Sequence, residues 1–382
     1  MYERRLLMIP GPTNVDPRVL RAMMRPIINH RSQAFGKILT ETCEMMKTVF
    51  RTENDVFLLT GSGTAGMEAA IANIIEPGDK VLCAISGKFG QRFKKIVETF
   101  GGNPIEVSAE WGQPINPDDI KRKLEENPDT KAVTLVFNET STATKNPVKE
   151  IGDIVKDYDA LFIVDTISAL SADEFYTDKY NVDICVNGSQ KDLAAPPGIS
   201  PIAVSEKAWE VIDNVEARTY YLSLRQCKEY FNRNPPQTPY TPAIPLFYAL
   251  NEALKMVLEE GLEKRIKRHE KIAKAVRAGI RALGLSLFAN QKYASNTVTA
   301  INIPEGITDS ELRGKMREKY GIEVAGGQDH LKGKIFRIGH MGTVQISDIL
   351  QTIGALELIL KESGLDIEPG SGVSAVEEVY LQ

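Results

Sequence analysis

Short apolar runs alternate with amphipathic stretches between about residues 55 and 205. The apolar runs are mostly continuous, which is expected of parallel strands that are buried on both faces. The stretches between them have the length and spacing of helices that cover such a sheet. The pattern therefore predicts an α/β fold with a doubly wound, mainly parallel sheet. The predicted strands are 56–59, 80–85, 132–137, 160–164 and 183–186, and the predicted helices are 64–75, 89–100 and 148–158.

The pattern changes after Pro245. Residues 246–283 form one long helical pattern, in which Leu254, Leu258 and Leu262 recur at helical spacing. The remainder predicts a smaller α+β domain, followed by a loop at 368–372 and a short tail. Its predicted strands are 298–301 and 334–338, and its predicted helices are 310–319 and 347–361.

Composition excludes several classes of protein. The chain has 46 lysines and arginines against 51 aspartates and glutamates, a formal net charge of -5. That balance argues against a nucleic-acid partner. The one basic run, 264–268, lies among glutamates and predicts a solvated helix face. The length of 382 residues fits one large domain and a smaller one.

The cysteines and histidines predict neither a disulfide framework nor a metal site. The four cysteines are few and scattered, and Cys83 and Cys185 lie inside apolar runs that are typical of buried thiols. The four histidines share no metal-ligand spacing. The apolar run near the N-terminus is too short for a signal peptide, and no stretch approaches the ~20 apolar residues of a membrane span. We expect a cytoplasmic protein without a membrane partner.

A glycine-rich segment, Gly61–Gly66, follows the first predicted strand and opens a helix. Its glycines let the backbone approach an anion, and the N–H groups at the helix start attract one. The segment also matches the dinucleotide fingerprint G-x-G-x-x-G, which requires an acidic residue at the end of the next strand. Asp79 instead lies before that strand. The pattern favours a single-phosphate site over a dinucleotide site or a purely structural turn.

Two charged residues follow later strands. Asp165 lies at the carboxyl edge of the sheet, where open α/β sheets bind ligands, with a turn cap as the alternative role. Lys191 follows the strand 183–186 among Ser, Gly and Pro, unlike a lysine on an amphipathic helix. A partly desolvated lysine has a lowered pKa and forms Schiff bases. An amine, a carboxylate for a pyridinium nitrogen and a phosphate site are what pyridoxal 5'-phosphate requires.

An ordered set of motifs extends from residue 6 to about residue 360. By these motifs the chain resembles the class V aminotransferases, in the alanine–glyoxylate and serine–pyruvate branch. It is similar above all to archaeal broad-specificity aspartate aminotransferases. Each motif is weak alone, but the ordered set is highly specific. The motifs are Ile9–Thr13, Gly61–Thr64, Gly87–Arg92, Asn138–Thr142, Val164–Thr166, Gly188–Lys191, Pro196–Gly198, Tyr240–Pro242 and Phe336–Gly339.

The resemblance implies a role for each matching residue. Lys191 would carry the cofactor as a Schiff base and transfer the substrate proton, and Asp165 would pair with the ring nitrogen. Arg337 would bind the substrate α-carboxylate with its planar fork, bordered by the backbone of Gly11. The other implied contacts are Ser62, Gly63, Thr64 and Gln190 at the phosphate, Phe89 stacked on the ring, Thr140 at the ring hydroxyl, and Thr241 with Tyr240 at the phosphate of a neighbouring subunit.

Two positions depart from the family pattern. Ala143 stands where the family often has glycine, and Thr64 stands where some members have histidine. Because alanine disfavours a positive φ, we expect the turn at Ala143 to differ. Thr64 offers a hydroxyl for the phosphate in place of an imidazole ring.

The resemblance also implies the architecture. The fold would be that of the aspartate aminotransferase superfamily, which is fold type I of the pyridoxal-phosphate-dependent transferases. Residues 1–14 would contribute to the active site, 15–260 would form the large cofactor-binding domain, and 261–382 would form the small domain. The active sites would be shared within a homodimer.

The implied reaction moves an amino group between alanine, serine or aspartate and glyoxylate, pyruvate or 2-oxoglutarate by a ping-pong mechanism. A second basic residue at the site would favour aspartate or glutamate, and His30, Arg31 and Lys145 are candidates. The alternatives are another class V enzyme of lyase type, an NAD-binding oxidoreductase and a non-catalytic binding protein. A desulfurase is disfavoured because no cysteine follows Cys227.

Overall fold

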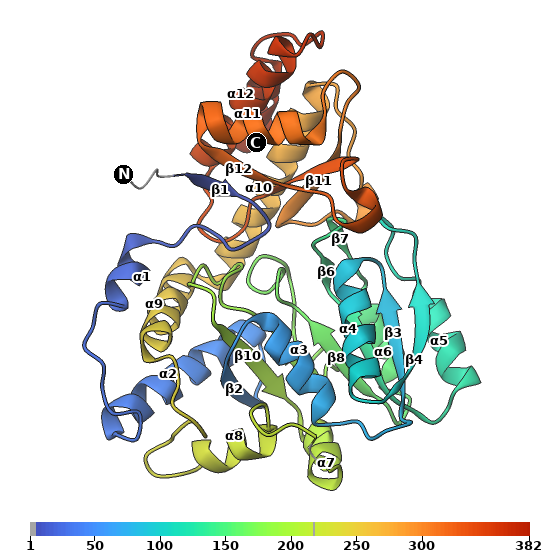
Figure 1. The fold of residues 1–382 in the computed structure, drawn as a ribbon, viewed down its shortest axis with the longest axis vertical. Coiled ribbons are helices and arrows are strands. Elements are labelled where there is room, and N and C mark those ends of the chain that lie inside the picture. The colour runs from blue at the N-terminus through green and yellow to red at the C-terminus, as the bar shows by residue number, and fades with distance from the viewer. Residues whose placement is uncertain (1–4, 217) are drawn as a thin grey trace.

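The computed structural model describes residues 5–216 and 218–382, so residues 1–4 of the predicted N-terminal segment lie outside the described residues. A broad lower part is built around one sheet, and a narrower upper part contains the C-terminal elements (Figure 1). No helix in the described ranges is both long and apolar enough to cross a membrane.

A seven-stranded sheet forms the centre of the lower part, in the order β2-β10-β9-β8-β5-β3-β4. Its strands pair in parallel, except that β10 runs antiparallel to both β2 and β9. The predicted doubly wound, mainly parallel sheet is confirmed. The strands are β2 (Asp55–Thr60), β3 (Lys80–Ile85), β4 (Asn103–Ser108), β5 (Thr130–Val136), β8 (Leu161–Asp165), β9 (Ile184–Val186) and β10 (Ile199–Val204).

Helices cover both faces of this sheet and bury two hydrophobic clusters against it. One cluster packs under α2, α5, α6 and α9, and the other packs under α3, α4, α7 and α8. Burial on both faces explains why the strands are continuous apolar runs. The helices are α1 (Pro17–Ala22), α2 (Gln33–Phe50), α3 (Gly63–Ala72), α4 (Lys88–Thr99), α5 (Pro117–Glu126), α6 (Val148–Val155), α7 (Glu206–Asn214), α8 (Leu224–Phe231) and α9 (Ile244–Glu260).

The upper part is built on a four-stranded sheet, in the order β1-β12-β13-β11. Its edge strand β1 (Leu6–Met8) comes from the start of the chain and pairs in parallel with β12 (Ile322–Gly326). The other strands are β11 (Val298–Asn302) and β13 (Ile335–Gly339), and the helices are α10 (Leu262–Ala282), α11 (Asp309–Tyr320), α12 (Ile346–Glu362) and α13 (Ser371–Leu381). The short elements are β6 (Asn138–Glu139), β7 (Thr144–Lys145), η1 (Gln291–Tyr293) and η2 (Asp329–Leu331).

The structure contradicts one sequence-based prediction about helices and adds one helix that was not predicted. The pattern at 246–283 is two helices rather than one, because Gly261 has φ +85° and separates α9 from α10. The C-terminal tail is helix α13, whose start is held by the buried carboxylate of Glu357. That carboxylate accepts hydrogen bonds from the N–H groups of Gly370 and Gly372. The division into domains 15–260 and 261–382 stays a prediction.

Candidate active site

A cavity of about 190 Å³ opens where β5 and β8 end and α3 and α4 begin. This is the carboxyl edge of the parallel strands, at which α/β sheets bind ligands. The fold brings eight predicted site residues to its wall from separate stretches of the chain. They are Ser62, Gly63, Thr64, Phe89, Thr140, Asp165, Gln190 and Lys191.

Lys191 lies in the loop between β9 and β10, packed against the segment that follows β1. Its Nζ donates a hydrogen bond to the carbonyl of Pro10, and Thr13 Oγ1 donates to the Lys191 carbonyl at 3.1 Å. Gly11 has φ +102°, and a Cβ there would lie 2.6 Å from Lys191 Cδ. Only glycine therefore allows the main chain to approach the lysine this closely.

Burial lowers the pKa of Lys191 to about 8, while Asp165 opposes this shift and Arg337 and Arg92 add to it. A lysine with this pKa has a substantial neutral fraction near pH 7, which is the form that attacks an aldehyde. The environment of Lys191 thus matches a nucleophilic amine rather than a solvated surface charge.

Asp165 ends β8 and is 3% exposed. Its Oδ1 accepts a hydrogen bond from Ile167 N–H at 2.7 Å, so it also makes the turn cap that was the alternative interpretation. Burial raises the pKa of Asp165 to about 7, although the Ile167 N–H opposes the shift. A cationic partner would relieve the cost of this buried charge.

The start of α3 provides polar groups for an anion. Ser62 is the N-cap residue, yet its side chain makes no capping hydrogen bond within the described part of the chain. Gln190 Oε1 is buried and has no hydrogen-bond partner among the described residues. Thr64 Oγ1 accepts a hydrogen bond from Arg92 Nη1 at 3.0 Å. These groups and the N-terminus of α3 fit the phosphate of pyridoxal phosphate.

Arg92 is a cavity residue to which the sequence analysis gave no role. Its guanidinium carbon lies 4.6 Å from the centre of the Phe89 ring. Phe89 and Arg92 are three residues apart on α4, so they lie on the same helix face. This spacing is present in the Gly87–Arg92 motif, and it was the signal from which the sequence analysis could have identified Arg92 as a cavity residue.

Glu139 is fully buried behind Phe89. Its Oε2 accepts hydrogen bonds from the N–H groups of Phe89 at 3.0 Å and Gly90 at 3.1 Å, in the first turn of α4. Burial raises the pKa of Glu139, and hydrogen bonds from Ser141 and from these N–H groups oppose the shift. Glu139 thereby fixes the first turn of α4 and, with it, the position of the Phe89 ring.

Thr140 belongs to a buried polar group that the sequence analysis found only in part. Thr140 Oγ1 lies 2.7 Å from Ser168 Oγ, and Asn138 Nδ2 donates to Ser168 Oγ at 3.0 Å. Asn138 and Ser168 also line the cavity. Ser168 lies in the turn after β8, and only the course of that turn brings it to the cavity. The residues around it in the sequence therefore gave no sign of its role.

The expected difference in the turn at Ala143 is wrong, because Ala143 has φ +59° and keeps a left-handed conformation. Its methyl group is buried with Val298 and Leu331. The Ala143 carbonyl also accepts a hydrogen bond from Ser295 N–H at 3.0 Å. Packing and this hydrogen bond stabilise a conformation that alanine disfavours.

Arg337 projects from β13 and is 6% exposed. Its Nη1 donates to the Thr140 carbonyl at 2.9 Å, and its Nε and Nη2 donate to the Gly326 carbonyl at 3.0 and 2.8 Å. Burial lowers the pKa of Arg337 to about 10, against the influence of Glu139. Arg337 is not in the cavity wall itself, but it is bonded to Thr140, which is.

Tyr240 and Thr241 do not reach the Lys191 cavity of their own chain, and they line a separate pocket with Thr60 and Tyr221. Arg31 holds this segment through the carbonyls of Thr238 and Pro239, at 2.6 and 3.0 Å.

None of the three candidates for a second basic residue, His30, Arg31 and Lys145, lines the Lys191 cavity, and two of them are engaged elsewhere. Arg31 binds the segment before Tyr240, and Lys145 Nζ pairs with Asp173 at 2.7 Å.

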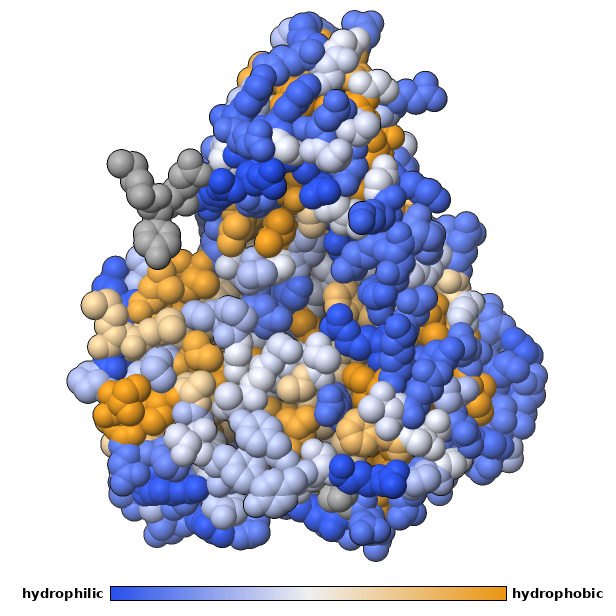
Figure 2. Space-filling model, in the orientation of Figure 1, coloured by the Kyte–Doolittle hydropathy of each residue, from blue (hydrophilic) through white to orange (hydrophobic). Residues whose placement is uncertain are grey.

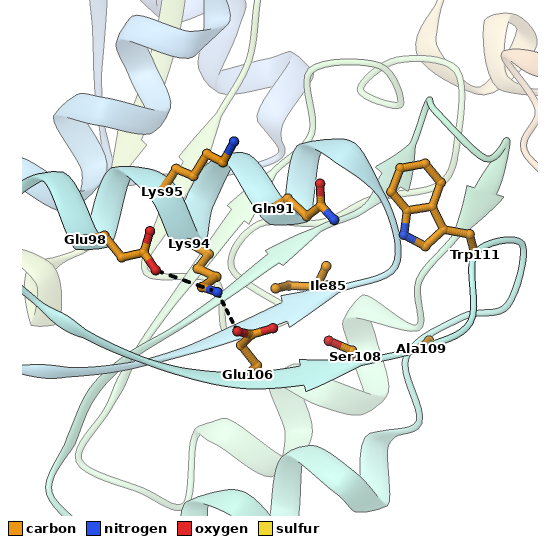
Figure 3. Close-up of a pocket in the computed structure, with 9 residues that line it drawn as sticks. All are labelled: Ile85, Gln91, Lys94, Lys95, Glu98, Glu106, Ser108, Ala109 and Trp111. Atoms are coloured by element: carbon orange, nitrogen blue, oxygen red, sulfur yellow. Dashed lines mark hydrogen bonds and ion pairs between the residues drawn. The ribbon is translucent and has the colours of Figure 1, made fainter. Parts of the chain in front are cut away.

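A second pocket, of about 320 Å³, lies between α4 and β4 (Figure 3). Lys94 spans it to Glu106 at 2.5 Å and to Glu98 at 3.6 Å. None of the predicted site residues lines this pocket, so it carries no part of the candidate chemistry. Among the described residues no cluster of His, Cys, Asp or Glu is arranged to hold a metal ion.

Comparison with known proteins identifies the family. Residues 6–352 match the family model described as aminotransferase class-V. An uncharacterized aminotransferase of Methanocaldococcus jannaschii is 54% identical over 99% of this chain and 98% of its own. An L-aspartate–glyoxylate aminotransferase of Paracoccus denitrificans is 35% identical over 100% of this chain and 98% of its own. The crystal structure of the ureidoglycine–glyoxylate aminotransferase of Bacillus subtilis superimposes with a TM-score of 0.96, at 37% identity, over 100% of this chain and 99% of that one.

The family match and these relatives agree with the cavity, in which a buried amine, a buried carboxylate and the N-terminus of α3 meet. They confirm the predicted resemblance and argue against a nicotinamide oxidoreductase. The chain belongs to the class V aminotransferase family and is a pyridoxal-phosphate-dependent aminotransferase.

Proposed function

We propose that the enzyme moves an amino group between alanine, serine or aspartate and a small 2-oxo acid (glyoxylate, pyruvate or 2-oxoglutarate) by a ping-pong mechanism. The observation that carries the proposal is the meeting of Lys191 and Asp165 in one cavity, with Arg337 bonded to its wall. Relatives named as aspartate–glyoxylate and serine–glyoxylate aminotransferases support the choice of substrates.

Each side chain has a distinct part in the proposed reaction. Bound pyridoxal phosphate supplies an electron sink for the electrons of the substrate Cα–H bond. Lys191 holds the cofactor and afterwards accepts the α-proton, which its lowered pKa permits. The buried carboxylate of Asp165 would pair with the protonated ring nitrogen, and this cation would offset the free-energy cost of burying the carboxylate. Arg337 exchanges its carbonyl partners for the substrate α-carboxylate, to which its fork binds with two parallel hydrogen bonds.

The remaining cavity residues position the cofactor. Phe89 would stack on the ring, and the Thr140 hydroxyl would bind the ring hydroxyl. Ser62, Gly63, Thr64 and Gln190 would hold the phosphate, and Arg92 would add a positive charge beside Thr64. Gly11 would border the substrate carboxylate through its backbone.

A Lys191→Ala variant tests the assignment of the reactive lysine. We expect the visible absorbance of the bound cofactor and all turnover to be lost, because alanine has no amine. Lys145→Ala is the matched control, since Lys145 is also partly buried but is paired with Asp173. Retention of absorbance and turnover in Lys191→Ala would refute the proposal.

A panel of amino donors with each oxo acid tests the substrates. Lys145 is ion-paired with Asp173, so it is not available to bind a second carboxylate. Arg31, like Arg337, is bonded among the described residues only to neutral groups. Turnover with aspartate as fast as with alanine and serine would indicate that Arg31 exchanges these partners for the second carboxylate, and slow turnover with aspartate would indicate that it does not.

The proposed working unit is a homodimer in which Tyr240 and Thr241 complete the partner's phosphate site. An apolar patch covers α1 and the segment after it, visible at the left of Figure 2, and includes Leu20, Met24 and Ile27 at 48%, 82% and 66% exposed. A patch of this kind is typical of a protein interface. The location of Thr241 outside its own cavity supports the exchange.

Mixing two inactive variants tests the shared site. If Thr241 acts across the interface, a hybrid of Lys191→Ala with Thr241→Ala contains one site that has both defects and one that has neither. Partial recovery of turnover is therefore expected if Thr241 acts across the interface. A monomer in sedimentation analysis, or no recovery in a mixture shown to form hybrids, would contradict the proposal.

The proposal includes a cytoplasmic location and small-molecule partners only. The four cysteines are buried free thiols, which fits a reducing compartment.

A further inference from the structure

Asp192, the residue after Lys191, lies at the centre of a buried polar cluster that the proposed reaction does not use. Its Oδ1 accepts a hydrogen bond from Gly342 N–H at 2.8 Å and lies 2.8 Å from His269 Nε2. Its Oδ2 accepts hydrogen bonds from Arg265 Nε at 3.1 Å and from the Ser171 hydroxyl. We call Asp192, Ser171, Arg265, His269 and Gly342 the Asp192 cluster.

The carboxylate of this cluster is held in its charged form. Burial alone would raise the pKa of Asp192, but His269 and Arg265 outweigh burial and keep the pKa well below its usual range. Glu260 in turn accepts a hydrogen bond from Arg265 Nη1 at 2.7 Å. A buried carboxylate with this set of donors keeps a fixed orientation, because each lost contact would leave a buried polar group unpaired.

The Asp192 cluster joins segments that carry the proposed active-site residues. Ser171 follows β8, which ends at Asp165, and Gly342 follows β13, which carries Arg337. Arg265 and His269 come from α10, the first helix after the break at Gly261.

Hydrogen bonds also hold the main chain beside Lys191. Arg265 Nη2 donates to the Asp192 carbonyl, and the Lys191 carbonyl accepts hydrogen bonds from Thr13 Oγ1 at 3.1 Å and from Ala194 N–H at 3.0 Å. The contacts thus fix the base of the lysine side chain and leave the amine at the cavity.

We propose that Asp192 is a positioning residue that fixes Lys191 relative to the strands bearing Asp165 and Arg337. The proposal rests on Lys191 being the lysine that holds the cofactor. The cluster ties Lys191 to β8 and β13 at once, so a change in its contacts displaces the amine from the cofactor aldehyde. A displacement of ~1 Å in a reacting group costs about 100-fold in rate.

The test measures how fast the visible absorbance of bound cofactor appears when pyridoxal phosphate is added to cofactor-free protein. We expect Asp192→Asn to slow this step by at least about tenfold and to lower kcat by about 100-fold. Asp183→Asn is the control, because Asp183 lies beside the far end of β9. It accepts hydrogen bonds from Phe162 N–H and the Ser205 hydroxyl, both at 2.9 Å. The control should lose thermal stability but keep the wild-type rate of absorbance gain.

A wild-type rate in folded Asp192→Asn would overturn the proposal. Equal slowing in Asp192→Asn and Asp183→Asn would overturn it as well, because the effect would then be general destabilisation. If Asp192→Asn does not fold, Ser171→Ala serves as the second test variant. It removes one hydrogen bond to Asp192 and keeps the charges of Asp192 and Arg265. Folded Ser171→Ala should react severalfold more slowly, and a wild-type rate in it would also overturn the proposal. Absence of absorbance in the wild-type protein would instead refute the proposed function.

Discussion

Replacing Asp165 by asparagine should make the cofactor-free protein more stable at neutral and alkaline pH while it abolishes activity. Asp165 is buried, and its pKa of about 7 lies well above the ordinary 3.8. The folded chain therefore binds more protons than the unfolded chain between these two pH values. The free energy of unfolding then falls as pH rises through this window, and the full penalty is present above about pH 7.

The magnitude follows from the width of that window. A shift of about three pKa units corresponds to about 4 kcal/mol. Asparagine keeps an oxygen to accept the Ile167 N–H, but its amide leaves an unpaired donor that costs about 1 kcal/mol at every pH. The variant should therefore be about 1 kcal/mol less stable than wild type near pH 4 and about 3 kcal/mol more stable above pH 8.

Urea unfolding of both cofactor-free proteins, at a series of pH values from about 4 to 9, measures this difference. Asp157→Asn is the control, because Asp157 is exposed and its substitution should leave the stability unchanged at all of these pH values. A difference for Asp165→Asn that does not vary with pH would refute the reasoning, as would a variant less stable than wild type above pH 8.

Three further predictions concern neighbouring residues. The rate of cofactor capture by cofactor-free protein should rise with pH around the Lys191 pKa of about 8. With this pKa, the neutral fraction of the Lys191 amine at pH 7 is about 300-fold larger than that of an ordinary lysine. A midpoint above pH 10 in stopped-flow absorbance would contradict this. Arg337→Lys should raise KM for the amino donor by about 100-fold, because a point charge replaces a bidentate fork; initial rates measure it, and an unchanged KM would count against carboxylate binding there. Ala143→Gly should change the free energy of unfolding by less than about 1 kcal/mol, because relief of the positive φ offsets the lost methyl packing. Urea unfolding measures this change, and a loss above about 2 kcal/mol would show that packing dominates.

The sequence predicted the core of the fold because parallel strands buried on both faces leave a strong local pattern. The same pattern located Asp165, at the end of β8, and Lys191, in the loop five residues after β9. The sequence analysis did not predict β10, and its direction was not predictable in this way, because an apolar run does not encode whether it pairs in parallel. The break at Gly261 was missed because Leu254, Leu258 and Leu262 keep helical spacing across it, although the glycine and the more charged composition of α10 were local signals.

Contacts between distant segments account for the site residues that sequence reasoning missed. Ser168 and Asn138 meet at the cavity only after β8 and β6 are in place. Asp192 is one residue from Lys191, but its significance lies in α10 and in the loop after β13. A single sequence without long-range information contains no pattern that joins these positions.

The pairing of β1 with β12 has a consequence for how the enzyme is made. Leu6 leaves the ribosome early, yet its partner Ile322 is synthesised about 300 residues later. At ~5–20 residues per second this interval is about 15–60 s. The segment that follows β1 carries Pro10 and Gly11, which contact Lys191. Pairing of β1, and with it the docking of Pro10 and Gly11 against Lys191, must therefore await the synthesis of β12, so a chain that has grown only past Lys191 does not yet present the complete surroundings of the amine to free aldehydes.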